Sequence, residues 1–247
     1  MELWGVTDSG KVRKHNQDVF KMHHYEDKDI AVLVVCDGMG GANAGDVASK
    51  LAVESFMHHL KAAIENAGNV CSKEDIAKMM IDAVLIANNT VYNKSLQDED
   101  FSGMGTTLTA AVSTSAGEII VNVGDSRLYH ITPGKITQIT RDHSVVEDMI
   151  ERGEITRSQA RRHSGRNLIT RALGASLHEA PDVFFIKMNK GESILLCSDG
   201  LTEVVLDSEI QYQLITGTSV QKSCEALVGM ALERGAPDNV TAVVLRK

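Results

Sequence analysis

Ala31-Val-Leu-Val-Val-Cys-Asp-Gly-Met-Gly-Gly41 is the stretch around which the rest of the chain is organised. Its apolar and mostly β-branched first part is followed at once by Asp37 and then by three glycines in four residues. The pattern predicts a buried strand that stops abruptly and presents a carboxylate at a glycine turn. A plainer interpretation is that Asp37 only caps the next helix and that the glycines supply positive φ.

Three further aspartates stand beside apolar runs. Asp199, like Asp37, precedes a glycine after a buried run, Asp125 follows another such run, and Asp238 precedes the last run of the chain. If the ends of these runs converge, four carboxylates meet in one pocket. Like charges in a dry pocket cannot all stay ionised unless cations neutralise them. The sequence therefore predicts a centre that holds more than one metal ion.

Composition limits the classes of protein to consider. The chain has 247 residues, 43% of them hydrophobic and 23% charged, which is typical of a globular protein, and no linker divides it, so we expect one domain over 1–247. A formal net charge of −8 argues against nucleic acid as the main partner. No apolar stretch approaches the roughly 20 residues of a membrane span and no basic leader is visible, so we expect a cytoplasmic protein without a membrane segment. No feature indicates an obligate partner, and we expect a monomer.

The cysteines do not have the spacing of a metal or redox motif. Cys36, Cys71, Cys197 and Cys224 form no Cys-x-x-Cys pair, and two of them stand inside predicted buried strands. We therefore expect buried free thiols.

Hydrophobic periodicity predicts the order of the secondary-structure elements. Short turns between successive strands favour antiparallel pairing, and one three-residue turn, Gly124-Asp125-Ser126, predicts a hairpin of the strands on either side. Strands and helices are clustered instead of alternating, which favours an α+β fold. The predicted strands are 2–8, 19–22, 31–36, 103–112, 118–123, 127–132, 135–140, 183–188, 194–198 and 240–245. The predicted helices are 44–64, 76–96, one that starts at 207, and 219–233.

The segment Val12 to Asp18 is rich in side chains that handle phosphate or metal. Arg13 is the candidate phosphate ligand, because a guanidinium recognises a phosphoryl group through two parallel hydrogen bonds. Asp18 is a candidate for orienting a metal-bound water. The alternative is a solvated hairpin without a role in chemistry.

A positive segment stands out in this acidic chain. Between Ile155 and His178 there is no acidic residue, whereas the segment contains Arg157, Arg161, Arg162, Arg166 and Arg171. One interpretation is a solvated helical insert. The other is a mobile lid that attracts a negatively charged substrate.

Taken together, these stretches resemble the metal-dependent serine/threonine protein phosphatases, the type 2C or PPM family, in their bacterial form. Any one of the motifs is weak, but the matches occur in family order and span most of the chain. They are Arg13-Lys-His-Asn-Gln-Asp18, Asp37-Gly-Met-Gly-Gly41, Gly105-Thr-Thr-Leu-Thr109, Val123-Gly-Asp-Ser-Arg127, Ser198-Asp-Gly-Leu201 and Pro237-Asp-Asn-Val-Thr241.

The resemblance implies an αββα sandwich of two antiparallel sheets with a metal centre at one end. By matching positions, Asp37 would bridge two Mn²⁺ or Mg²⁺ ions, the Gly38 carbonyl would bind the first, and Asp199 and Asp238 the second. Asp125 would help to hold a third, weaker ion. Oxygen-only ligands suit these ions better than zinc. Arg13 would hold the substrate phosphate, and a segment at about 144–174 would be the flap beside the site. The substrates would be phosphorylated proteins, and the enzyme would oppose a serine/threonine kinase.

Two positions depart from the family pattern. Many eukaryotic members have a histidine, proposed as the acid for the leaving group, where this chain has Met39, so the proton must come from elsewhere. Gln17 stands where many relatives have glutamate, which removes one charge near the first metal. Neither change removes a proposed direct ligand.

Two other functions are compatible with parts of this pattern. An aspartyl-phosphate phosphatase of the haloacid dehalogenase type needs a second aspartate two residues after the nucleophile, where this chain has Met39. A catalytically inactive sensor with the same fold would bind metal without turnover.

Overall fold

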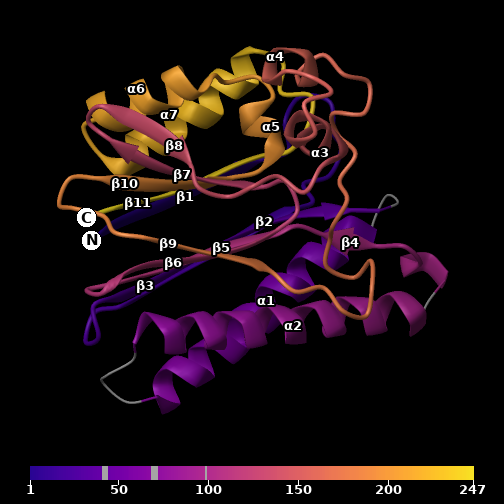
Figure 1. Ribbon diagram of the computed structural model, residues 1–247, viewed down its shortest axis with the longest axis horizontal. Coiled ribbons are helices and arrows are strands. Elements are labelled where there is room, and N and C mark those ends of the chain that lie inside the picture. The colour runs from indigo at the N-terminus through magenta and orange to yellow at the C-terminus, as the bar shows by residue number, and fades with distance from the viewer. Residues whose placement is uncertain (41–43, 68–71, 98) are drawn as a thin grey trace.

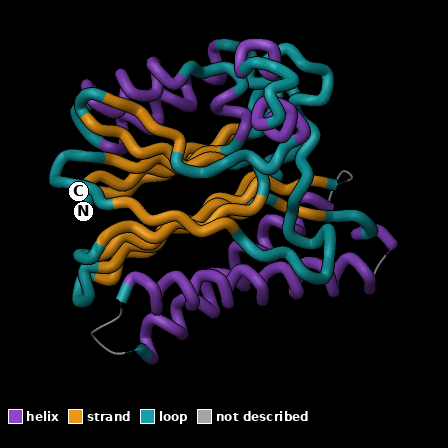
Figure 2. Tube along the Cα trace, in the orientation of Figure 1, coloured by secondary structure: helices purple, strands orange, loops and turns teal. Residues whose placement is uncertain are grey.

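Two antiparallel sheets face each other, and helices cover both outer faces (Figure 1). This computed structural model describes residues 1–40, 44–67, 72–97 and 99–247. The expected α+β class and αββα sandwich are confirmed. Figure 2 shows the four layers in cross-section, with the strands of the two sheets stacked between helices.

The first sheet has the strand order β1-β11-β10-β7-β8. All of its neighbouring strands pair in antiparallel fashion. Its strands are β1 (Glu2–Asp8), β11 (Val240–Arg246), β10 (Ser193–Cys197), β7 (Arg127–Thr132) and β8 (Lys135–Gln138).

The second sheet has the order β2-β3-β5-β6-β9, and the short strand β4 pairs with the end of β3. These pairs are antiparallel as well. Its strands are β2 (Asp18–Tyr25), β3 (Ile30–Met39), β5 (Leu108–Thr114), β6 (Gly117–Val123), β9 (Asp182–Ile186) and β4 (Gly105–Thr106).

Long helices cover the sheets, and short ones gather at one end of the sandwich (Figure 1). Helices α1 (Ala44–Asn66) and α2 (Lys73–Gln97) pack on the second sheet, and α6 (Asp207–Thr216) and α7 (Val220–Glu233) on the first. The short elements are η1 (Glu99–Phe101), α3 (Val145–Glu151), α4 (Arg157–Ala160) and α5 (Asp199–Thr202). None of the helices in the described ranges has the length and apolarity needed to cross a membrane.

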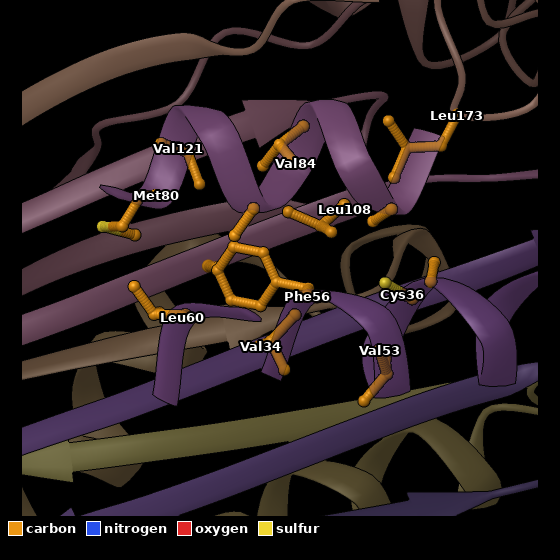
Figure 3. Close-up of a cluster of buried hydrophobic side chains, with 14 of the residues drawn as sticks. Val34, Cys36, Val53, Phe56, Leu60, Met80, Val84, Leu108, Val121 and Leu173 are labelled. Atoms are coloured by element: carbon orange, nitrogen blue, oxygen red, sulfur yellow. The ribbon is translucent and has the colours of Figure 1, made fainter. Parts of the chain in front are cut away.

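Strand β3 explains why the opening stretch is apolar at every position. Val32, Val34 and Cys36 pack under α1 and α2, whereas the alternate residues Leu33 and Val35 pack between the two sheets. Both faces of the strand are therefore buried, which requires an apolar residue at each step. Figure 3 shows the helix-covered side of this core around the ring of Phe56, which α1 inserts against the sheet.

The expected hairpin around Gly124-Asp125-Ser126 is wrong. Strand β6 pairs with β5 and β9 in one sheet, and β7 pairs with β8 and β10 in the other. The turn instead carries the chain from one sheet to the other, with Gly124 at φ 104°. Asp125 is consequently placed where the ends of both sheets meet.

Two strand boundaries also differ from expectation. Strand β3 continues through Asp37 to Met39, because Gly38 and Met39 pair with β4. The strand expected over 103–112 is divided at Thr107, whose hydroxyl accepts a hydrogen bond from the Asp37 backbone N–H at 2.9 Å. Cys36, Cys197 and Cys224 are buried free thiols, as expected. Cys71 and Gly41 lie outside the described residues.

Candidate metal centre

A cavity of about 210 Å³ opens at the end of the sandwich where the short helices gather. It collects residues from distant parts of the chain, and its wall contains almost every residue that the sequence nominates. The lining residues are Arg13, Gln17, Asp37, Gly38, Met39, Gly40, Thr107, Asp125, Asn167, Ile169, Asp199 and Asp238.

Asp37 is aimed into this region by the alternation of β3. It continues the row of Leu33 and Val35, whose side chains lie between the sheets. The next residue, Gly38, lies so close to the start of α1 that a Cβ there would be 2.1 Å from the Gly45 carbonyl oxygen. Glycine is therefore required at this position for packing, and the close approach fixes the Gly38 backbone beside the carboxylate.

Asp18 lies beneath the cavity and does not line it. It is the cross-strand partner of Asp37 and only 4% exposed. Its Oδ2 accepts hydrogen bonds of 2.6 Å from the hydroxyls of Ser198 and Thr241. Its buried Oδ1 has no hydrogen-bond partner in the described part of the chain. Burial raises the pKa of Asp18 to about 6, against the opposing effect of the two hydroxyls.

The other carboxyl groups are also held in a poorly solvated place. Burial, and after it the charge of Asp18, raises the pKa of Asp37 well above its usual value. Burial and the charge of Asp142 raise the pKa of Asp125 to about 7. The pKa of Asp199 is raised well above its usual value by burial and by Asp125, and its buried Oδ1 lacks a hydrogen-bond partner among the described residues. Such shifts mark carboxyls whose negative charge is uncompensated.

Arg13 and Asp238 are joined directly. The guanidinium Nη2 donates to Asp238 Oδ2 at 2.6 Å across 225 positions of sequence, with Arg13 55% exposed. The carboxylate raises the pKa of Arg13 through this bond. The Arg13 side chain thus lies at the exposed rim of the acidic cavity.

The acidic residues fit divalent cations in chemistry. The donor set consists of carboxylates and a backbone carbonyl, which hard cations such as Mn²⁺ and Mg²⁺ prefer. The orphaned buried oxygens of Asp18 and Asp199 supply acceptors that a cation or its hydration water can satisfy. Within the described ranges, no group of three His, Cys, Asp or Glu side chains lies close enough together to hold a metal ion. The carboxylates therefore line a common cavity and do not form a closed cage.

The flap segment, residues 144–174, forms one side of this end of the molecule. A second cavity of about 200 Å³ lies against it and shares Asp125, Asn167 and Asp199 with the first. Four of the six arginines of the flap segment form ion pairs: Arg152 with Glu154, Arg157 with Glu147, Arg166 with Glu203, and Arg171 with Glu179 and Asp182. Arg161 and Arg162 are exposed and form no ion pair within the described chain.

Sequence reasoning missed several residues of the site. Asn167 and Ile169 reach the cavity from the flap, and Ser198 and Thr241 hold Asp18. Ser198 and Thr241 stand inside the quoted motifs and could have been found there as candidate hydroxyl donors. No sequence pattern distinguishes Asn167 and Ile169 from ordinary loop residues.

Comparison with known proteins identifies relatives over nearly the whole chain. A family model described as protein phosphatase 2C matches residues 10–240. The chain is 33% identical over 241 residues to a protein named serine/threonine phosphatase stp from Listeria innocua, covering 98% of this chain and 94% of the relative.

Solved structures of related proteins have a similar fold. The serine/threonine phosphatase Stp1 from Staphylococcus aureus is 34% identical with a TM-score of 0.91, over 100% of this chain and 94% of the other. The catalytic domain of the serine/threonine protein phosphatase PstP, solved in complex with two manganese ions, is 34% identical with a TM-score of 0.81, over 98% and 96% of the two chains.

Proposed function

The chain belongs to the protein phosphatase 2C family, and on that premise we propose that it hydrolyses phosphoserine and phosphothreonine in proteins at a centre of two divalent cations. It is a serine/threonine protein phosphatase of the bacterial type. The observation that carries the metal-dependent mechanism is the gathering of Asp37, Asp125, Asp199 and Asp238 around one cavity beside Arg13.

The ligand assignment follows the residues of the cavity. Asp37 would bridge two Mn²⁺ or Mg²⁺ ions, the Gly38 carbonyl would bind the first, and Asp199 and Asp238 the second. Asp125, beside Asp199, would contribute to a third and weaker site. The manganese-containing PstP structure supports metal binding in this fold. Bound cations would supply an activated water and neutralise charge on the phosphoryl oxygens.

Side chains of the protein itself would bind the substrate phosphate and orient water. Arg13 has guanidinium donors left after its bond to Asp238 and would hold two phosphoryl oxygens of the substrate. Asp18, held by the hydroxyls of Ser198 and Thr241, would accept a hydrogen bond from a water at the floor of the site through its free Oδ1. Met39 lines the cavity and has no proton to give, so the leaving oxygen must be protonated by a water or by another group of the site.

The flap segment would act on the protein part of the substrate. Among the residues that the structure describes, no carboxylate pairs with Arg161 or Arg162, and Arg161 lines the cavity that adjoins the metal centre. They would attract acidic phosphoprotein segments. We infer that the opposing enzyme is a serine/threonine kinase.

Hydrolysis of p-nitrophenyl phosphate and of a phosphothreonine peptide tests the proposal directly. Purified protein is assayed with Mn²⁺, with Mg²⁺ and with EDTA. Activity that appears with a divalent cation and is lost in EDTA is the expected result. A folded protein that binds Mn²⁺ without turnover would instead support the inactive sensor, and a trapped phosphoaspartate would support the dehalogenase-type mechanism.

A further inference from the structure

His143 lies outside the proposed ligand set and is nevertheless completely buried beside it. It stands at the last position before the flap segment, between the turn that carries Asp125 and the start of β9. Its ring and backbone contact both neighbours, and neither the proposed chemistry nor the hydrophobic core accounts for an imidazole there.

Two hydrogen bonds join His143 to Gly124, the residue before Asp125. The Gly124 backbone N–H donates to His143 Nδ1 at 3.0 Å, and the His143 backbone N–H donates to the Gly124 carbonyl at 3.0 Å. Gly124 adopts φ 104°, so the turn has an unusual backbone conformation that these bonds maintain. The ring nitrogen thus helps to set the direction in which Asp125 leaves the turn.

The opposite side of the ring contacts the far end of the flap. Because Nδ1 accepts a hydrogen bond, the neutral ring carries its proton on Nε2. Nε2 lies 3.2 Å from Asp182 Oδ2 and 2.9 Å from Nη1 of the flap residue Arg171, and the same Nη1 donates to Asp182 Oδ1 at 2.9 Å. Burial lowers the pKa of His143 more than the hydrogen bond to Asp182 raises it, and the charge of Arg171 lowers it further, which favours this neutral form.

We propose that His143 is a positioning residue of the metal centre, which holds the Gly124–Asp125 turn through Nδ1 and anchors the end of the flap through Nε2, Asp182 and Arg171. The inference rests on the proposed metal-dependent function. It connects the carboxylate of the third, weaker ion site to the segment that meets the substrate, through one side chain with two separable contacts.

Two substitutions of His143 test its contact with Gly124 and its contact with Asp182 separately. In His143→Asn the amide oxygen is attached at the same distance along the side chain as Nδ1, so it accepts from Gly124 but does not reach Asp182. In His143→Gln the amide is one methylene longer and occupies the place of Nε2, so it reaches Asp182 but leaves the Gly124 N–H unpaired. His130→Gln is the matched control, because His130 Nε2 also pairs with a carboxylate, Glu192 at 2.9 Å, outside the site.

The first measurement is calorimetric titration with Mn²⁺. His143→Gln should weaken the weakest resolved Mn²⁺ site by about tenfold, the effect usual for residues that orient metal ligands, and should resemble Asp125→Asn. His143→Asn and His130→Gln should bind as the wild type does.

The second measurement is the rate of tryptic cleavage after Arg161 and Arg162, which are exposed and unpaired within the described chain. His143→Asn should be cleaved several times faster than wild type, and Arg171→Met should behave in the same way. His143→Gln and His130→Gln should be cleaved at the wild-type rate.

The proposal is supported if His143→Gln weakens only metal binding and His143→Asn weakens only the protection of the flap segment. If both His143 variants match wild type in both measurements, or if both lose metal affinity and flap protection together, the two-sided positioning role is wrong. Absence of Mn²⁺ binding by the wild type would instead overturn the proposed function, and the cleavage rates would then still decide whether His143 anchors the flap.

Discussion

Asp18 and Asp37 face each other as direct cross-strand partners of β2 and β3, so that two carboxyl groups share the floor of the metal centre. Like charges at opposed positions of a ladder repel each other. Burial and then the charge of Asp18 raise the pKa of Asp37, and burial raises the pKa of Asp18. Metal-free protein therefore contains a region whose ionisation opposes folding.

Stability without metal should consequently fall as pH rises. Folded-state pKa values above the unfolded value stabilise the protein at low pH, and this stabilisation is lost as pH passes about 6 for Asp18 and about 7 for Asp125. In EDTA, we expect Tm to drop by several degrees from about pH 5 to about pH 8, the range over which these carboxyl groups lose their protons in the folded protein. Excess Mn²⁺ should abolish most of the drop in a thermal scan. A Tm that rises with pH in EDTA would contradict the prediction.

Asp37→Asn and Asp238→Asn should each reduce kcat at least about a thousandfold, because cation-based stabilisation of the transition state is worth several kcal/mol. At a pH where Asp37 is ionised, Asp37→Asn should also raise Tm in EDTA, since it removes a poorly solvated negative charge that faces Asp18. Asp46→Asn, which alters only a surface pair with Lys50, is the control. Undiminished turnover of either folded variant would refute the ligand assignment.

Gly38→Ala should destabilise the fold and impair metal binding together. The new Cβ would lie 2.1 Å from the Gly45 carbonyl oxygen, so β3 and α1 must separate, at a cost of roughly 1–3 kcal/mol. Urea denaturation and Mn²⁺ titration measure the two effects. Gly134→Ala, where no atom lies within 4 Å of the added Cβ, should leave both unchanged.

Arg13→Lys should raise KM for a phosphopeptide and for p-nitrophenyl phosphate to a similar degree, by about tenfold. Lysine keeps the charge but loses the forked pair of donors that suits a phosphoryl group. Steady-state kinetics on both substrates checks this. An increase confined to the peptide would place Arg13 outside the phosphate site.

Replacing Arg161 and Arg162 with alanine should raise KM for a phosphoprotein several-fold while KM for p-nitrophenyl phosphate stays constant. The two side chains are exposed cations, and only a macromolecular substrate extends to them. Raised ionic strength should reduce the difference. Equal effects on the two substrates would reject the role of the flap segment in recognition. Arg157→Ala, which removes an arginine that is paired with Glu147, serves as the comparison variant.

Much of the fold could be predicted because each element has a strong local signal. The helix expected over 44–64 is observed as Ala44–Asn66, and the strand expected over 127–132 is observed with those bounds. Runs that are apolar at every position, such as β3, already indicate a strand buried on both faces. The aspartates at their ends were recognisable for the same reason, since a carboxylate is out of place beside such a run.

The pairing of the strands was harder to predict from the sequence. A three-residue turn at Gly124-Asp125-Ser126 is compatible both with a hairpin and with a passage between sheets, and periodicity does not distinguish them. The choice depends on which distant strands compete for each edge: β9 pairs with β6, and β10 with β7.

The sequence by itself determined the α+β class, the positions of most elements and the set of aspartates that stand beside the apolar runs. Only the tertiary structure decided that Asp18 lies under the cavity, that Arg13 bonds to Asp238, and that His143 connects the Asp125 turn to the flap. The physical reason is distance along the chain. Periodicity and turn residues report interactions over a few positions, whereas these contacts join side chains up to 225 residues apart, and only the packing of the two sheets brings them together.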